Sequence, residues 1–340
     1  MKRRVPGERG GSHAIGIIVV GVLGVVVGLV AGVLLVPFSG FAGDDDAAAL
    51  PSADPAGFVF ERIGPGVTEV RDQQDITVAT LTEGARTVTL AGPLRVFAES
   101  GTRASVETGQ WVRLAPQPWH ASAQDETWAR TWLSHALAER SPDILEIATQ
   151  YVQGTPDQVD ADGLRFAGDA AFGPELDNGK RQIGADFYDF LDRPWSFGDG
   201  TEKTPSAGQA GALDCSGFLR MVYGYRSGLP LLAGDTGEGL PRRADSMAHD
   251  GPGTLLLEDE GSRPLDLANL KPGDLLFFTT DDEPDIDHSA IYLGLDSDDR
   301  HRFISSRAGA NGPTMGDFGG ASVLDGDGFF AERFRMARRV

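Results

Sequence analysis

The sequence has very little cysteine and comparatively little positive charge. Cys215 is the single cysteine among 340 residues, which excludes an internal disulfide and any cysteine-rich metal site. Basic residues number 30 against 50 acidic ones, and the net charge is -20. Because contacts to phosphate groups need clustered Lys and Arg, we expect no nucleic-acid partner. A strongly acidic surface mainly keeps a protein soluble.

Charge is absent from one long stretch, residues 14–38, which is rich in Val, Leu and Gly. It is long enough to cross a bilayer, which takes about 20 apolar residues. A basic tail over residues 1–13 precedes it and three aspartates, 44–46, follow it, a pattern that orients the N-terminus towards the cytoplasm. We therefore expect a single-pass anchor in the cell membrane, with the C-terminal part of the chain outside the cytoplasm. A cleaved signal peptide is the alternative, although its apolar core is usually about 7–15 residues.

Three glycines within the anchor recur at four-residue spacing: Gly24, Gly28 and Gly32. This spacing could let two anchors pack closely and self-associate, although glycine is common in membrane spans generally. Residues 39–57, rich in Ser, Gly, Asp, Ala and Pro, predict a flexible linker.

Residues 58–120 predict a small all-β module of SH3-like or similar type. Short runs of β-forming residues alternate there with breaks at Gly84, Gly92-Pro93, Gly101 and Gly109. The expected strands are Ile76–Leu81, Thr87–Leu90, Leu94–Phe97 and Trp111–Leu114. No ligand for the module can be named from these residues.

Helical periodicity follows over residues 121–140, where Trp128, Trp132, Leu133 and Leu137 share one face and predict a connecting helix. Ser141-Pro142 then predicts an N-cap with proline at the first helical position, and a helix running to Gly154. We place the start of the second domain at this point, over residues 141–340.

The only cysteine lies at a predicted helix start. Asp214 occupies the N-cap position. Phe218, Val222 and Tyr225 form one apolar face of the predicted helix, which Gly228 and Pro230 end. Cys215 is then in the first turn, where the helix dipole and unpaired backbone N–H groups favour the thiolate. Gly217 leaves the backbone bare beside the sulfur, which would let a substrate carbonyl approach. The alternative is that a lone cysteine is simply a small buried hydrophobic residue.

A thiol nucleophile needs a base, and His288 is the best placed histidine. It enters an apolar strand, Ala290–Leu293, that would hold the imidazole rigidly against a helix packed on the sheet. The run Asp274–Phe278 predicts the antiparallel neighbour of that strand. The histidines that we set aside are His120, His135, His249 and His301.

Three ordered motifs resemble the NlpC family of bacterial cell-wall cysteine peptidases: Asp214–Gly217, Leu270–Phe278 and His288–Gly294. The resemblance implies a papain-like α+β fold over about residues 141–340, with the nucleophile helix packed on an antiparallel sheet. It also implies hydrolysis of amide bonds in peptidoglycan stem peptides, with Cys215 as nucleophile and His288 as general base. No metal ion or organic cofactor is expected.

The family usually places a His, Asn, Gln or Glu on the next strand to orient the imidazole. Here Ser305 occupies that position and supplies no charge, so the chain departs from the pattern. Ser306, Asn311 or Asp317 could serve instead if the loop folds back.

A second departure lies upstream, where Pro194-Trp195 stands in place of the family's Pro-Tyr motif. We assign substrate binding to Asp214, Ser216 and Gly217 around the nucleophile, and to Trp195, for which a position in the core is the alternative.

The leading hypothesis is a membrane-anchored thiol hydrolase of cell-wall peptides. The first alternative is an inactive relative that binds cell-wall peptide or a partner protein without cutting it. The second alternative is an acyl or peptidyl transferase with the same Cys-His chemistry.

Overall fold

A computed structural model of the chain describes residues 53–340. The basic tail, the predicted anchor, its three glycines and nearly all of the linker therefore lie outside the described residues. Within residues 53–340, no helix has both the length and the apolar character needed to cross a bilayer.

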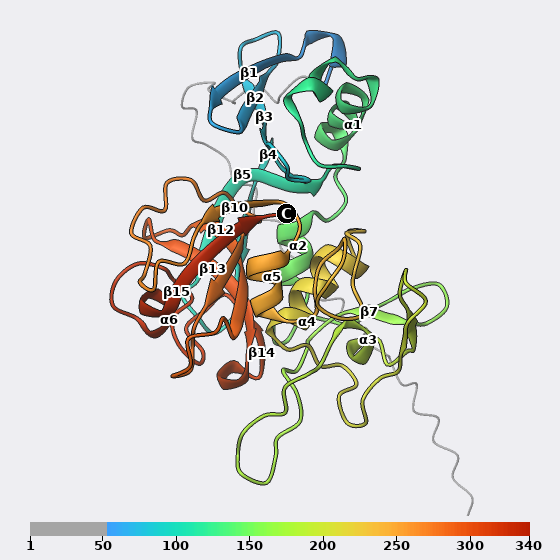
Figure 1. The fold of residues 1–340 in the computed structure, drawn as a ribbon, viewed down its shortest axis with the longest axis vertical. Helices are drawn as coiled ribbons and strands as arrows, with labels where there is room; N and C mark the ends of the chain where they lie inside the picture. Colours follow the sequence, from blue (N-terminus) through green and yellow to red (C-terminus); the bar gives the residue numbers. More distant parts are fainter. Residues whose placement is uncertain (1–52) are drawn as a thin grey trace, which may run out of the picture. The chain divides into compact units, whose positions relative to one another are not determined.

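The first sheet has five antiparallel strands in chain order (Figure 1). They are β1 (Val59–Gly64), β2 (Val67–Arg71), β3 (Thr77–Thr82), β4 (Thr87–Ala98) and β5 (Ser105–Leu114). The expected breaks at Gly92-Pro93 and Gly109 are wrong, because β4 and β5 run through them. The register against β5 shifts between Ala91 and Arg95, so the strand bends there and continues.

Helix α1 (Thr127–Ala138) packs its apolar side against this sheet, as the tryptophan and leucine spacing predicts. Two short 3-10 turns, η1 (Pro55–Gly57) and η2 (Ala121–Asp125), precede it. Helix α2 (Ile144–Thr149) begins later and ends sooner than expected. Its N-cap is Asp143 and not Ser141, because the Asp143 carboxylate accepts the Glu146 N–H at 3.0 Å.

Loops dominate residues 155–213. The short elements in them are β6 (Gln158–Val159), β7 (Arg165–Ala167), α3 (Phe187–Phe190), β8 (Trp195–Ser196) and β9 (Glu202–Lys203).

The second sheet has six strands in the order β10-β15-β11-β12-β13-β14, and every neighbouring pair is antiparallel. The strands are β10 (Thr254–Leu257), β11 (Leu275–Phe278), β12 (His288–Leu295), β13 (His301–Arg307), β14 (Gly312–Thr314) and β15 (Phe334–Arg339). The predicted antiparallel pairing of the two motif strands, β11 and β12, is confirmed.

Alternate residues of β12 face two different layers. Ile291 and Leu293 belong to the core that contains α4 (Cys215–Leu219), while Ala290 and Tyr292 belong to the core that contains Phe330 of α6 (Phe329–Arg333). The remaining helical elements are the π-helix η3 (Arg220–Tyr225), α5 (Ala244–Asp250) and η4 (Ala308–Ala310). The molecule is therefore an α+β protein.

The β4–β5 hairpin reaches into the core that contains α4. Phe97, Val106 and Val112 pack in the same apolar cluster as Phe218 of α4 and Ile291 of β12.

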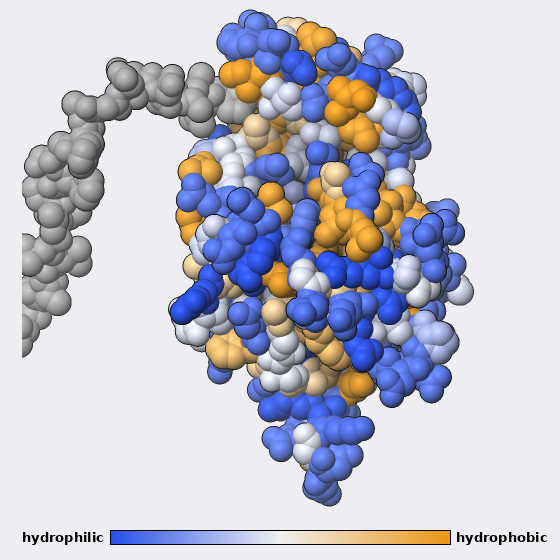
Figure 2. Space-filling view, turned by 90° about the vertical axis from the view of Figure 1, so that its left-hand side faces the viewer, coloured by the Kyte–Doolittle hydropathy of each residue, from blue (hydrophilic) through white to orange (hydrophobic). Residues whose placement is uncertain are grey.

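On the face shown in Figure 2, hydrophobic residues gather near the middle and hydrophilic residues predominate below them.

Asp143 ties the hairpin to α2. Its buried carboxylate accepts the Val112 N–H at 2.6 Å and pairs with Arg95 at 2.5 Å. Removing one member of a buried ion pair leaves the other charge uncompensated, which costs about 3 kcal/mol or more.

We therefore expect Asp143→Asn to lower the free energy of unfolding by about 3 kcal/mol in chemical denaturation. The matched control is Glu146→Gln, because Glu146 also pairs with Arg95 but at 3.6 Å and with a side chain that is 41% exposed. We expect this control to change stability by less than about 1 kcal/mol. Equal effects of the two substitutions would contradict the assignment.

Candidate functional site

Cys215 is the first residue of α4, as the sequence predicts. The Asp214 carboxylate caps the helix by accepting the Gly217 N–H at 2.7 Å. The helical path continues as a π-helix from Arg220 to Tyr225, and Gly228 adopts the left-handed conformation that ends it. Asp214 is thus a structural cap, and its carboxylate is engaged within the protein.

A network of charges, buried except for the partly exposed Arg242, surrounds the helix start. Arg242 donates to Asp214 at 2.8 Å and to the Ser216 hydroxyl at 2.6 Å, and also pairs with Asp186 at 3.4 Å. Arg220 pairs with Asp186 at 2.9 Å. Two carboxylates and two guanidiniums therefore balance one another. Sequence reasoning missed Asp186, Arg220 and Arg242, because nothing in their local pattern shows that three distant segments converge.

Gly217 does not leave space for a substrate. A Cβ at this position would lie 2.1 Å from the Ala185 carbonyl oxygen, so the chain preceding α3 packs directly on the helix there. The expectation that the bare backbone admits a substrate carbonyl is wrong. The glycine is required by close packing of backbone on backbone.

The cysteine opens into a cleft of ≈ 600 Å³. Acidic residues are the most numerous group in its wall, and Arg242 and Arg243 are its cationic residues. The lining residues are Ile183, Gly184, Asp214, Cys215, Ser216, Arg242, Arg243, Ala244, Asp245, Asp281, Glu283, Asp285, Ile286 and Asp287. Asp214 and Ser216 of the predicted binding set therefore border this cleft.

The thiol lies against the main chain on either side of His288. Its sulfur is 3.8 Å from the Asp287 carbonyl oxygen, and hydrogen bonding from Ser289 favours the thiolate. Burial outweighs this effect. It raises the pKa of Cys215 to about 12, the Asp214 charge adds to the rise, and Arg242 opposes it. The expectation that the helix start yields a thiolate is therefore wrong for this structure, in which Cys215 is only 8% exposed.

His288 is buried against aromatic rings. Its imidazole lies 5.3 Å from the Phe330 ring and 5.8 Å from the Phe278 ring, centroid to centroid. Burial, followed by the charge of Arg307, lowers the pKa of His288 to about 3, although Asp214 opposes the change. Within the described residues no hydrogen bond joins the imidazole to the Cys215 thiol. Both groups are therefore neutral at pH 7.

Ser305 is buried on β13, next to Ile304, which pairs with Ile291 of β12. The Ser305 hydroxyl and Nε2 of His288 are both buried without a hydrogen-bond partner. The predicted contact between these two groups is therefore not formed.

The alternatives to Ser305 are engaged elsewhere. Ser306 donates to the Leu213 carbonyl at 2.5 Å, Asn311 accepts the Phe172 N–H at 3.4 Å, and Asp317 is 3.9 Å from Arg302.

Trp195 lies outside the cysteine cleft. Its ring packs edge-on against Phe187 at 5.1 Å and against Tyr225 at 5.7 Å. This position matches the core alternative and gives no support to a substrate-binding role.

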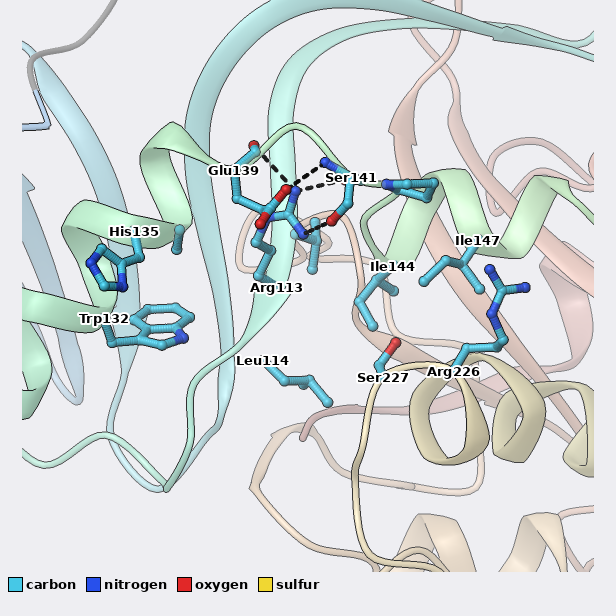
Figure 3. Close-up of a pocket in the computed structure, with 13 residues that line it drawn as sticks. Arg113, Leu114, Trp132, His135, Glu139, Ser141, Ile144, Ile147, Arg226 and Ser227 are labelled. Atoms are coloured by element: carbon cyan, nitrogen blue, oxygen red, sulfur yellow. Dashed lines mark hydrogen bonds between the residues drawn. The ribbon is translucent and has the colours of Figure 1, made fainter. Parts of the chain in front are cut away.

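A separate cavity of ≈ 340 Å³ lies where β5, α1 and α2 meet (Figure 3). Trp132 and His135 project into it from α1, and Arg113 crosses it to reach the Ser141 carbonyl at 2.7 Å. It contains no nucleophilic cysteine. The cleft at Cys215 is therefore the stronger candidate for covalent chemistry.

Close packing at Gly217 makes a testable prediction. We expect Gly217→Ala to destabilise the protein by about 1–3 kcal/mol, the usual range for overpacking, because the Ala185 carbonyl must move. Gly198→Ala is the matched control, since no atom lies within 4 Å of the position that a Cβ would take there. Thermal unfolding of both variants measures the difference, and a Gly217→Ala protein as stable as the control would contradict the packing argument.

Residues 192–312 match the model of the NlpC/P60 family. Among solved structures, the chain is similar to a crystal structure of an NlpC/P60 family protein from Bacillus cereus ATCC 10987. That similarity has 15% identity, covers 83% of this chain and 78% of the other, and has a TM-score of 0.26. A TM-score this low carries no argument about fold or function. No curated protein matches the chain.

The family match contains both Cys215 and His288, and it contains all three of the motifs in full. It is narrower than the span of residues 141–340 over which the motifs resemble the family. The similarity to the NlpC/P60 family is thus established for residues 192–312.

Proposed function

We propose that this protein is a cell-wall peptide hydrolase, with a papain-like site in which Cys215 is the nucleophile and His288 the general base. The observation that carries the proposal is the position of the thiol. It opens into a ≈ 600 Å³ cleft at the start of α4, and its sulfur lies 3.8 Å from the carbonyl of the residue before His288.

The chemistry follows from two neutral groups. The imidazole of His288 takes the proton of the Cys215 thiol as the sulfur attacks the amide carbonyl carbon. The N–H groups of Cys215 and Ser216, which have no acceptor within the helix, are available to the resulting oxyanion. The imidazolium then protonates the leaving amine, a thioester remains, and water with His288 as base releases the carboxylic acid and restores the thiol.

Peptidoglycan stem peptides are the proposed substrates, as the family resemblance implies. The charge-free run of residues 14–38 would hold the site at the outer surface of the cell membrane. The proposed reaction at Cys215 and His288 does not depend on the anchor.

A binding protein without hydrolytic activity is the second candidate. It is favoured by the neutral, buried thiol and by the missing hydrogen bond between Nε2 of His288 and Ser305. A transferase is the third candidate, in which an amine replaces water at the thioester.

Release of wall fragments tests the proposal. The full chain in detergent is incubated with purified peptidoglycan, and the soluble products are identified by mass spectrometry. We expect fragments from the parent protein and at least a hundredfold less from Cys215→Ala and His288→Gln, because both groups act in bond cleavage. Fragments from all three proteins would exclude the assigned residues. No fragments from any, across several wall types and pH values, would favour the binding protein, and amine adducts in the presence of added amine would favour the transferase.

The pKa of Cys215 makes a second prediction. Because burial raises it to about 12, we expect iodoacetamide to alkylate the resting protein more slowly than free cysteine at pH 7, with the rate still rising above pH 9. The chain has a single cysteine, so the total alkylation rate reports this thiol. Urea-unfolded protein is the control and should react like free cysteine. A native rate that is already maximal at pH 7 would instead indicate a resting thiolate.

A further inference from the structure

The β4–β5 hairpin inserts a buried carboxylate into the second sheet. Glu99, which directly follows β4, is 6% exposed. Its carboxylate accepts the Thr314 hydroxyl at 2.8 Å and the main-chain N–H groups of Met315 and Gly316, each at 2.8 Å. A buried carboxylate is tolerated only when such donors compensate for its lost hydration. Glu99 therefore fixes the end of β14 to the hairpin.

Strand β14 supports the part of β13 that lies nearest to His288. Thr314 pairs with Ser305 and Gly312 pairs with Arg307. The Arg307 guanidinium is held by the Gly320 carbonyl at 2.6 Å and by the Ser322 hydroxyl. Movement of β14 would therefore move both Ser305 and Arg307.

Arg307 and His288 share one aromatic neighbour. The guanidinium carbon of Arg307 lies 4.5 Å from the centroid of the Phe330 ring, and the His288 ring lies 5.3 Å from the same centroid. No carboxylate within the described residues forms an ion pair with Arg307, and Glu99 supplies the largest favourable charge for it. A short series of contacts therefore leads from Glu99 to the imidazole.

We propose that Glu99 is a positioning residue for His288, acting through β14, Arg307 and Phe330, so that the β4–β5 hairpin is a built-in part of the active site. The expected effect of Glu99 on the reaction rate rests on the proposed function. Its expected effect on the titration of His288 does not. The charged and titratable groups around that imidazole are Arg307 and Asp214, with Cys215 beside its main chain.

The test compares Glu99→Gln with Glu107→Gln in the full chain. Glu107 lies on the same hairpin but is exposed, so the control makes the same substitution without removing a buried carboxylate. Histidine side-chain NMR is recorded against pH, with His288→Gln identifying the His288 signals. The rate of peptide release from peptidoglycan is measured alongside.

We expect the His288 signals of the parent and of Glu107→Gln to stay constant down to about pH 4, because the buried imidazole remains neutral. In Glu99→Gln, loosening of β14 hydrates the imidazole, and its titration midpoint should rise by at least one pH unit. We also expect kcat to fall at least tenfold while KM changes less than twofold. Glu99→Asp should restore neither the parent's His288 titration nor its kcat, because the shorter side chain does not reach the N–H groups of Met315 and Gly316.

Two results would overturn the inference. One is a Glu99→Gln protein that melts at a lower temperature but keeps the parent's His288 titration and kcat, since Glu99 would then be purely structural. The other is an identical change in Glu107→Gln. If Glu99→Gln fails to fold, Thr314→Val replaces it, because this variant removes one donor to Glu99 and preserves side-chain shape. If the parent releases no peptide, the proposed function fails while the NMR comparison still decides the role of Glu99.

Discussion

Two buried carboxylates, the buried guanidinium of Arg220 and the partly exposed guanidinium of Arg242 hold the only cysteine in place at the start of α4. The helical path begins at Cys215 and continues without a break into η3, and side-chain contacts fix its first turn. Asp214 is fixed from both sides, by the Gly217 N–H at 2.7 Å and by Arg242 at 2.8 Å. Because each buried charge is matched, the network avoids the large cost of an unpaired ion. The same contacts bring Asp186, which precedes α3, next to α4.

The burial that fixes the thiol also keeps it protonated. A sulfur surrounded by protein loses the hydration that stabilises a thiolate, and the neighbouring Asp214 charge acts in the same direction. His288 loses the hydration that stabilises an imidazolium, so its pKa moves the opposite way. The two groups therefore rest as a neutral thiol and a neutral base. In this state the cysteine is protected from oxidation, because the thiolate is the reactive form.

Local patterns predicted the elements of the site well, and tertiary contacts account for the errors. The N-cap at Asp214, the helix start at Cys215 and the pairing of β11 with β12 each depend on neighbours in the sequence, and each is confirmed. Gly217 was misinterpreted because its neighbour, the Ala185 carbonyl, comes from a distant segment. The electrostatics of the site were mispredicted for a similar reason. The prediction of a thiolate included the effect of the helix start on the pKa of Cys215. It did not include the effect of burial, which depends on the folded chain. Arg242 was not identified at all, because an arginine after a loop gives no sign that it will contact Asp214. The roles of Ser305 and His288 in catalysis stay predictions.

Packing of the first sheet's hairpin against the second sheet places residues of both sheets in one apolar cluster. Val106 and Val112 of β5 lie in the same cluster as Leu219 of α4 and Ile291 of β12. A chain cut at residue 141 would expose these contacts on the second sheet and would also remove the Glu99 carboxylate from β14. The all-β module is therefore not a detachable addition. Its hairpin is part of the packing that holds β14 against β13, and β13 in turn pairs with β12, which carries His288.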